Sequence, residues 1–241
     1  MIVNTRGVVI KQTKFSDSGV IVKIFTEQYG MQSFFVRGLK SRKSKSKAAM
    51  FQPLSILDLV INFSDKKSLQ TIKDIDLAYS YKSIPDNMVK RSVLFFIVEL
   101  LYKCLKDEVK NKELFDWING SLVWLDIANE GYANFHLLFM MQLTKFLGFY
   151  PSKLSMMEIS IFDLQDGQFT NTIPLHGNYL SGDEVNNIMS IYSKSFEDAT
   201  SIKFNRENRM QVLENLIKYY NFHIPSMGGF KSLEILSVIL D

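Results

Sequence analysis

The sequence is poor in the residues that build disulfides and metal sites. It has one cysteine, Cys104, and three histidines in 241 residues. A single cysteine excludes an intramolecular disulfide and any cysteine-rich metal site. The histidines, His136, His176 and His223, lie far apart in the sequence, with no metal-ligand spacing around them. We therefore expect no bound metal and no cofactor.

Common catalytic motifs are also missing. Neither G-x-x-x-x-G-K-[ST] nor G-x-G-x-x-G occurs, and Gly228–Gly229 is best explained as a turn. The pairs Asp183–Glu184 and Glu197–Asp198 fall at predicted helix starts, where acids complement the helix dipole. A nuclease would need clustered carboxylates for its metal, and the N-terminal acids do not cluster. The sequence therefore predicts a protein that is not an enzyme.

No long apolar run is present. The most apolar stretch, residues 93–105, is broken by Glu99 and Lys103, so it predicts a buried helix rather than a membrane span. The first residues, "MIVNTRGVVIKQ", do not resemble a signal peptide. We expect a cytoplasmic protein without a membrane partner.

The charge is distributed unevenly along the chain. Residues 1–83 carry 14 basic and 6 acidic side chains, whereas residues 84–241 carry 14 and 19. A basic first part joined to a mildly acidic second part indicates an anionic partner for the first part alone. We therefore predict two domains, residues 1–83 and residues 84–241.

The first domain has the pattern of short strands. Segments 5–13, 19–26, 32–37, 54–62 and 69–77 are rich in Val, Ile, Phe and Thr, and turn signals separate them. With no helix between them, five strands favour a closed Greek-key barrel, the OB fold. An SH3-like barrel is the alternative that spacing does not exclude.

The second domain changes to helical spacing after Pro85. Helices are predicted over residues 85–106, 111–129, 133–148, 181–194, 205–222 and 230–240. Gly148 is a plausible C-cap, and Ser181 and Glu184 have capping-box spacing. Residues 149–180 form a small irregular insert, in which "QDGQ" indicates a hairpin turn. The fold class is thus multidomain α and β, an OB barrel followed by a helical domain.

A basic loop is the strongest functional signal. Six basic residues fall between positions 37 and 47 with no acid among them, and the loop joins two apolar strands that pin both its ends. Its serines can donate to phosphate oxygens. We predict that the loop contacts nucleic-acid phosphates through Arg37, Lys40, Arg42, Lys43, Lys45 and Lys47, and that Arg6, Lys11, Lys14 and Lys23 extend the track.

Aromatic side chains lie beside this charge. Basic residues and rings together bind single strands, because charge follows the backbone and rings stack on bases. Phe34 and Phe35 face opposite sides of one predicted strand, so at most one is a stacking platform. An anionic membrane is a rival target, but no basic amphipathic helix accompanies the loop. A structured-RNA or ribosome-associated binding module is the alternative function.

These residues resemble a known family. "SDSGVIVKIFTEQYGMQSFFVRGLKSRKSK" and "AAMFQPLSILDLVI" are similar to the N-terminal barrel of the RecO recombination-mediator family. Downstream, "FHLLFMMQLTKFLGFYP" resembles the family helix that ends in a Leu-Gly step, and "FKSLEIL" resembles its closing segment. The motifs occur in family order over nearly the whole chain. Matching positions are Asp17, Phe25–Thr26, Gly30, Arg37–Gly38, Arg42–Lys43 and Gln52–Pro53.

The resemblance implies an activity and partners. Members bind single- and double-stranded DNA, promote annealing, and help load the RecA recombinase onto DNA coated by single-stranded DNA-binding protein, working with RecR. It also implies that the helical domain docks the acidic, apolar tail of single-stranded DNA-binding protein. The basic residues predicted for that contact are Lys203, Arg206, Arg209 and Lys218.

One departure from the family concerns zinc. Many relatives carry a four-cysteine zinc knuckle after the "LGFYP" step, but this chain has "SKLSMMEISIFDLQDG" there. We therefore expect no structural zinc. Apolar side chains would hold the insert instead, and the candidates are Met156, Ile159, Ile161 and Phe162.

Overall fold

The computed structural model describes residues 1–15, 19–38, 45–106, 109–153, 159–225 and 227–239. The chain forms two compact units, and neither is one continuous stretch. The first comprises residues 1–87 and 97–127, and the second comprises residues 88–96 and 128–241. The predicted division after residue 83 stays a prediction.

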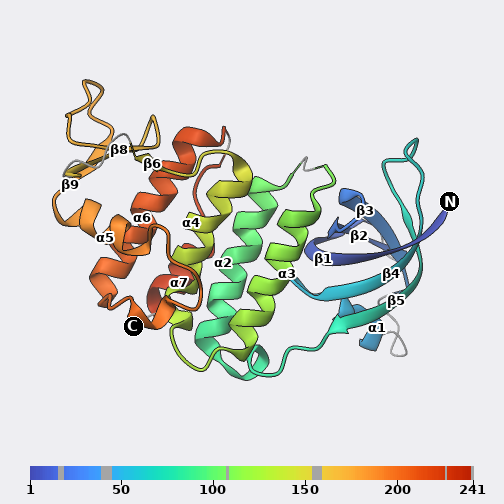
Figure 1. The fold of residues 1–241 in the computed structure, drawn as a ribbon. Helices are drawn as coiled ribbons and strands as arrows, with labels where there is room; N and C mark the ends of the chain where they lie inside the picture. Colours follow the sequence, from blue (N-terminus) through green and yellow to red (C-terminus); the bar gives the residue numbers. More distant parts are fainter. Residues whose placement is uncertain (16–18, 39–44, 107–108, 154–158, 226, 240–241) are drawn as a thin grey trace. The chain divides into compact units, whose positions relative to one another are not determined.

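The first unit begins with a five-stranded antiparallel sheet (Figure 1). Its strands are β1 (Ile2–Lys14), β2 (Gly19–Thr26), β3 (Gly30–Arg37), β4 (Ile56–Asn62) and β5 (Thr71–Tyr79), in the order β3-β2-β1-β4-β5. A parallel bridge between Phe34 and Gln70 joins the outer strands β3 and β5. Closure in this order produces an OB-like barrel, which confirms the predicted fold class.

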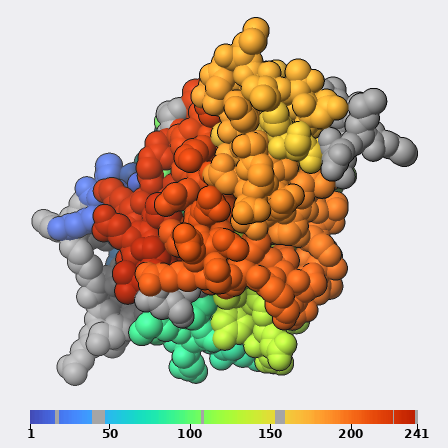
Figure 2. All heavy atoms as spheres, turned by 90° about the vertical axis from the view of Figure 1, so that its left-hand side faces the viewer, coloured from blue at the N-terminus to red at the C-terminus, as the bar shows by residue number. Residues whose placement is uncertain are grey.

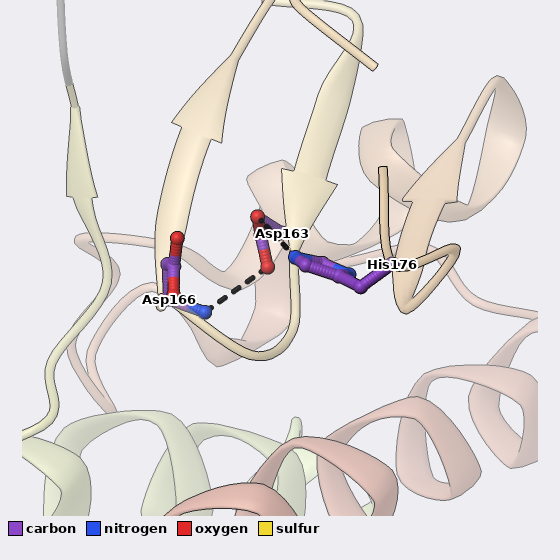
Figure 3. A group of neighbouring side chains, drawn as sticks. All are labelled: Asp163, Asp166 and His176. Carbon is purple, nitrogen blue, oxygen red and sulfur yellow. Dashed lines mark hydrogen bonds and ion pairs between the residues drawn. The ribbon is translucent and has the colours of Figure 1, made fainter. Parts of the chain in front are cut away.

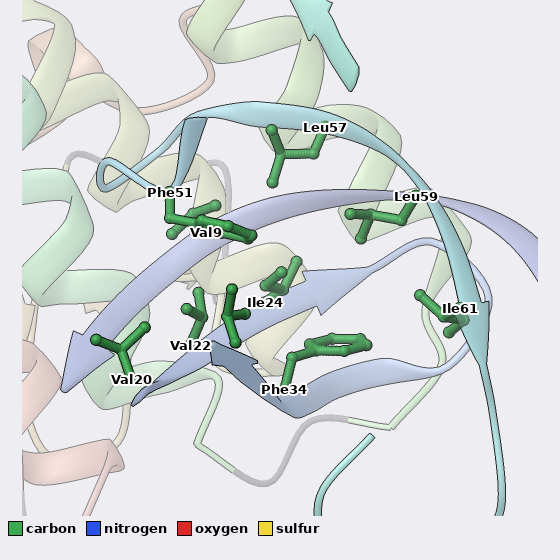
Figure 4. Close-up of a cluster of buried hydrophobic side chains, with 10 residues drawn as sticks. Val9, Val20, Val22, Ile24, Phe34, Phe51, Leu57, Leu59 and Ile61 are labelled. Carbon is green, nitrogen blue, oxygen red and sulfur yellow. The ribbon is translucent and has the colours of Figure 1, made fainter. Parts of the chain in front are cut away.

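Alternation along the strands separates an apolar interior from a polar exterior. Val22 and Ile24 of β2 and Phe34 of β3 are fully buried in one cluster, together with residues from β1 and β4 (Figure 4). The residues between them point outward, as the period of two requires. Phe34 is therefore core, and the exposed side of β3 carries Phe35.

Strand β1 depends on a glycine. A Cβ at Gly7 would lie 2.5 Å from Ile24 Cγ2 and 3.0 Å from Leu59 Cδ1, so only glycine fits between these neighbours. The register of β1 against β2 then shifts between Val9 and Lys11, which indicates a β-bulge. Beyond the bulge, Lys11 stands opposite Lys23.

Thr26, which is buried, stabilises the turn between β2 and β3. Its hydroxyl donates to the Gly30 carbonyl at 2.8 Å and accepts from the Tyr29 N–H at 3.2 Å. Gly30 has φ 65°, a conformation that favours glycine. These contacts explain the "FTEQYG" pattern between β2 and β3.

Two helical segments complete the first unit. They are the second half of α2 (Met88–Cys104) and α3 (Lys112–Ile127), whose Phe115 ring lies 6.1 Å from that of Phe25. Asp126 of α3 is buried, and its carboxylate accepts from the N–H groups of residues 82–84 and from the Tyr79 hydroxyl. One of these donors is the N–H of Ile84, the first residue of a short 3-10 helix, Ile84–Asp86, that lies between β5 and α2.

The second unit is built around α4 (Phe135–Leu147), which is almost wholly buried. α5 (Asp183–Ile191), α6 (Arg206–His223) and α7 (Leu233–Ile239) complete its helices, and Tyr220 of α6 donates to the Met140 carbonyl at 2.7 Å. Gly148 ends α4 with φ 85°, as predicted. The capping-box prediction is wrong, because Gly182 is the N-cap of α5 and Glu184 accepts from Asn215 instead.

The insert is more regular than its sequence indicates. It contains β6 (Ser152–Lys153), β7 (Ile161–Asp163), β8 (Gln168–Thr170) and β9 (Tyr179–Ser181), in the order β6-β8-β7-β9. β7 and β8 form the hairpin predicted at "QDGQ". Ile161 and Phe162 are buried and Ile159 is half-buried, whereas Met156 lies outside the described residues. In Figure 2 the light-orange segment of this region projects from one end of the second unit.

Candidate nucleic-acid interface

A groove opens where β3 and the start of β5 meet the short helix α1 (Lys45–Met50). Its volume is about 450 Å³. Phe35 and Arg37 reach it from the outward positions of β3, and Lys47 reaches it from α1. The remaining lining residues are Val36, Phe51, Thr71 and Ile72. The groove therefore combines an aromatic ring, apolar walls and two basic side chains.

The rings at the groove are available for stacking. Phe35 is half-buried, and the Arg37 guanidinium lies 5.2 Å from its ring centroid. Phe15, at the end of β1, is 62% exposed, and its ring meets that of Phe35 edge-on with centroids 5.8 Å apart. A partly exposed phenylalanine beside a guanidinium is the combination that single-strand-binding surfaces use.

The outer face of β1, β2 and β3 continues this chemistry in register. Directly opposite residues lie on the same face of a sheet. Thr13, Ile21 and Phe35 form one such row, and Lys11, Lys23 and Ser33 form the next row along the strands. At the other end, Arg37 pairs with Gly19. We call these outward residues, together with Phe15 and Lys47, the basic face.

The predicted contacts of the loop are only partly described. Arg37 and Lys47 are exposed and line the groove. Lys40, Arg42 and Lys43 lie outside the described residues. Lys45 lies in α1, but its side chain is also outside the described set. Gly38, with φ 77°, follows the last residue of β3 and leads into the loop.

The predicted contacts on the strands divide between two surfaces. Lys11 and Lys23 lie together on the basic face, and Lys14 is exposed at the end of β1. Arg6 lies elsewhere, because its Nε is 3.3 Å from the Asp58 carboxylate. The structure therefore does not bring Arg6 together with the other predicted residues.

Arg6 belongs to a second groove of about 400 Å³, lined mainly by β1, β4 and β5. Its charged residues are otherwise acidic, namely Glu27, Asp58, Asp74 and Asp76. Asp58 and Asp76 stand directly opposite each other on neighbouring strands. We call this surface the acidic groove, and it repels a phosphate backbone.

Sequence reasoning missed two aromatic residues at the basic face. Phe15 directly precedes the turn residues "SDSG", where a single ring shows no periodic pattern. Tyr102 lies in the most apolar stretch of the chain, yet Lys11 and Lys23 lie 3.9 and 5.8 Å from its ring centroid. No local pattern could have indicated that contact, because it joins residues about ninety positions apart.

The basic residues predicted in the second unit have different surroundings. Arg206 and Arg209 line a hollow of about 550 Å³ with Val89, Tyr132 and Ile239. Arg209 is half-buried and donates to Asn134 at 3.1 Å and to the Phe204 carbonyl at 3.0 Å, so it also holds the fold. Lys203 and Lys218 are exposed and do not line this hollow.

Asp163, Asp166 and His176 form a compact group in the insert (Figure 3). Asp163 accepts from the N–H groups of Gln165 and Asp166 and lies 3.1 Å from His176 Nε2. His176 Nδ1 accepts from the Asn178 N–H, so Nε2 carries the proton and donates to Asp163. Both ring nitrogens already have partners, and we interpret the group as a hydrogen-bonded clasp.

His136 is fully buried in α4. Neither ring nitrogen has a hydrogen-bond partner among the described residues, and the ring packs edge-on against Phe96. Burial, assisted by the nearby Arg209 guanidinium, lowers the pKa of His136 to about 3. The residue is thus a neutral core histidine, and it opens to no described hollow of the second unit.

The barrel and its basic face define the class of this protein: an OB-barrel protein with an appended helical unit. Its sequence matches the family model described as Recombination protein O N terminal over residues 1–81. It matches the model described as Recombination protein O C terminal over residues 86–234. The chain belongs to the RecO family of DNA repair proteins.

Several curated relatives cover the same length. The DNA repair protein RecO of Bacteroides fragilis is 32% identical over 242 residues, which is the whole of both chains. That of Phocaeicola vulgatus is 33% identical over 98% of each chain, and that of Flavobacterium johnsoniae is 34% identical over 99% of each. Within the described residues, no helix is long and apolar enough to cross a membrane.

Proposed function

We propose that the protein is a non-enzymatic recombination mediator that holds single-stranded DNA on the basic face and the adjoining basic loop. The observation that carries this proposal is the groove in which Phe35, Arg37 and Lys47 meet. Charged side chains there would follow the phosphates while Phe35 and Phe15 stack on bases. Duplex binding would use the same charges without the stacking.

Family membership supports the wider role. A protein that holds single strands from two molecules on such a face can promote their annealing, and it can help load RecA onto DNA coated by single-stranded DNA-binding protein. RecR is the expected protein partner. We expect the protein to act in the cytoplasm, at the nucleoid.

Fluorescence anisotropy of a labelled single strand across a salt series tests the proposal. If all six predicted loop residues neutralise one phosphate each, the log–log salt slope will be about −4, and half engagement will give about −2. Arg37→Ala with Lys47→Ala should lower the slope by about 1.4. A shallow wild-type slope would contradict the proposal.

Phe35→Ala separates stacking from charge. It should weaken single-strand binding by about 1–3 kcal/mol and leave the salt slope unchanged. Ile72→Ala, from the same groove but without a ring, is the matched control. A folded RNA of equal charge forms a third arm, and tighter binding of that RNA would favour the structured-RNA module instead.

We further propose that the hollow beside Arg206 docks the tail of single-stranded DNA-binding protein. Support comes from a basic side chain beside the apolar surface of Val89, Tyr132 and Ile239. Arg206 is the residue to change, because it is exposed and donates to the Ser237 carbonyl at 3.1 Å, whereas Arg209 is half-buried and holds two separate segments. Arg206→Glu should abolish retention on an immobilised tail peptide, whereas Lys218→Glu, on the same helix but outside the hollow, should not. Equal retention by both variants would refute this site.

A further inference from the structure

Lys11 and Lys23 form a concentrated positive site on the outer face of the barrel. They stand directly opposite each other on β1 and β2. Like charges in this arrangement destabilise a sheet. Among the residues that the structure describes, neither ammonium group has an acidic partner. The arrangement therefore has a cost that a bound anion would remove.

Tyr102 joins these lysines from α2. The Lys11 Nζ lies 3.9 Å from the centroid of its ring and the Lys23 Nζ lies 5.8 Å from it. A hydrogen bond from Lys11 lowers the pKa of the Tyr102 hydroxyl, and the charges of Lys11, Lys23 and Lys106 act in the same direction against burial. Three ammonium groups thus act on one hydroxyl.

The site lies in line with the groove. The Lys11–Lys23 row is two residues along β2 from the row that contains Phe35, and the Gly19–Arg37 row lies two residues beyond that. At about 3.3 Å per residue, the rows from Lys23 to Gly19 span about 13 Å. A dinucleotide seated beside Arg37 carries a single internucleotide phosphate and would not reach Lys11, whereas a longer strand would.

We propose that Lys11, Lys23 and Tyr102 bind a backbone phosphate of a nucleic-acid strand that leaves the groove across the outer face of β2. This inference rests on the proposed function. The ligand is a phosphate rather than a base, because Lys11 already covers one face of the Tyr102 ring at 3.9 Å. Two ammonium groups and a hydroxyl together suit its oxygens.

The competing explanation is structural. A cation over a tyrosine ring is attracted to it, and in that case Lys11 would serve only to hold α2 against the barrel. That role requires one lysine and no second lysine directly opposite it. It also predicts a loss of stability without a change in the salt dependence of binding.

The experiment compares a labelled thymidine dinucleotide with a labelled oligothymidylate of about 12 nucleotides, a length within the site sizes of single barrels. Lys11→Gln/Lys23→Gln should weaken binding of the longer strand and reduce its salt slope by about 0.7, the value for one phosphate. Binding of the shorter strand should be unchanged. Lys73→Gln/Lys110→Gln, which removes two exposed lysines of the same unit, is the charge-matched control and should alter neither.

Tyr102→Phe keeps the ring and removes the hydroxyl. It should weaken only the longer strand, by a smaller factor, and leave the thermal midpoint unchanged. Equal losses for both lengths, or equal losses in the control double variant, would overturn the inference while leaving the proposed function intact. Failure of the wild type to bind either strand would overturn both.

Discussion

The basic face and the acidic groove are two outer surfaces of one sheet, and β1 contributes to both. Before its bulge, β1 places Arg6 beside Asp58 in the acidic groove. After the bulge, it places Lys11 beside Lys23 on the basic face. The interior is equally apolar beneath the two surfaces, since Ile24 and Leu59 belong to the same cluster.

The two surfaces show how a small barrel separates the residues that pack its core from those that carry its surface charge. Inward positions are constrained by volume, so every strand contributes the same kind of residue to the core. Outward positions have no such constraint and can carry opposite charge on neighbouring strands. An approaching polyanion is then attracted to one side of the barrel and repelled from the other, which sets its orientation before contact.

The largest expected effect comes from breaking the strand that both surfaces share. Gly7→Val would drive a side chain into Ile24 and Leu59 and should destabilise the barrel by about 3 kcal/mol. DNA binding should be lost with the fold. Urea unfolding measures this, with Gly120→Ala as the control, because a Cβ there meets open space. Equal stability of the two variants would contradict the packing described for β1.

A second variant weakens the scaffold while leaving the basic face untouched. Asp126→Asn replaces the carboxylate that accepts from the N–H groups of Lys82, Ser83 and Ile84 with a neutral amide. The change should lower the free energy of unfolding by about 2–3 kcal/mol at neutral pH. DNA affinity of the folded fraction should be unchanged. Chemical unfolding combined with anisotropy checks both statements, and a changed salt slope would argue against the separation of scaffold and surface.

The same variant has a defined pH dependence. Burial raises the pKa of Asp126, but the backbone N–H donors and the Tyr79 hydroxyl outweigh it, so the net shift is downward. The folded pKa thus lies below the unfolded value of about 3.9. The stabilisation is present above that value and is lost as the pH falls through the folded pKa. The difference between wild type and Asp126→Asn should therefore shrink below about pH 4.

The pH dependence of stability also has a source outside both surfaces, namely His136. Its folded pKa of about 3 lies below the unfolded value of about 6.5, so falling pH favours the unfolded state. Stability should fall by about 1.5 kcal/mol between pH 6.5 and pH 5 from this residue alone. His136→Leu should remove that dependence. An unchanged pH profile would assign the acid sensitivity to other groups.

Reversing the charge of the acidic groove sharpens the functional contrast. Asp74→Lys/Asp76→Lys should tighten single-strand binding by less than about tenfold, because the strand follows the other surface and gains only general attraction. The salt slope should change by less than about 1. A steepening of about 1.4, equal to two new phosphate contacts, would show that DNA also crosses the acidic groove.

The smallest effect concerns stability within the acidic groove. Asp76→Asn removes the repulsion from Asp58 directly opposite and should stabilise the barrel by about 0.5 kcal/mol at low salt. Asp74→Asn, opposite the uncharged Val60, is the control and should have less effect. Differential scanning calorimetry at two salt concentrations resolves this, and a gain that persists at high salt would exclude an electrostatic cause.

Much of the fold was predictable because its signals are local. Alternation, turn residues and the change of period after Pro85 are each readable within a few residues, so the barrel strands and the main helices were expected. The short strands of the insert were not, because strands of two or three residues are too brief to show a period. The N-cap of α5 was missed for the same reason. The expected cap, Ser181, belongs to the three-residue strand β9, and Gly182 is the N-cap instead.

Local sequence patterns were enough to predict the barrel, the helical unit, the excess of positive charge near the N-terminus and the opposite directions of Phe34 and Phe35. The tertiary structure was needed to show that Phe35 is the outward ring, that Arg6 lies among acids, and that Tyr102 contacts Lys11 and Lys23. Strand periodicity is a property of neighbouring residues. The electrostatic surroundings of a side chain depend on closure and register, which bring together residues far apart in the chain.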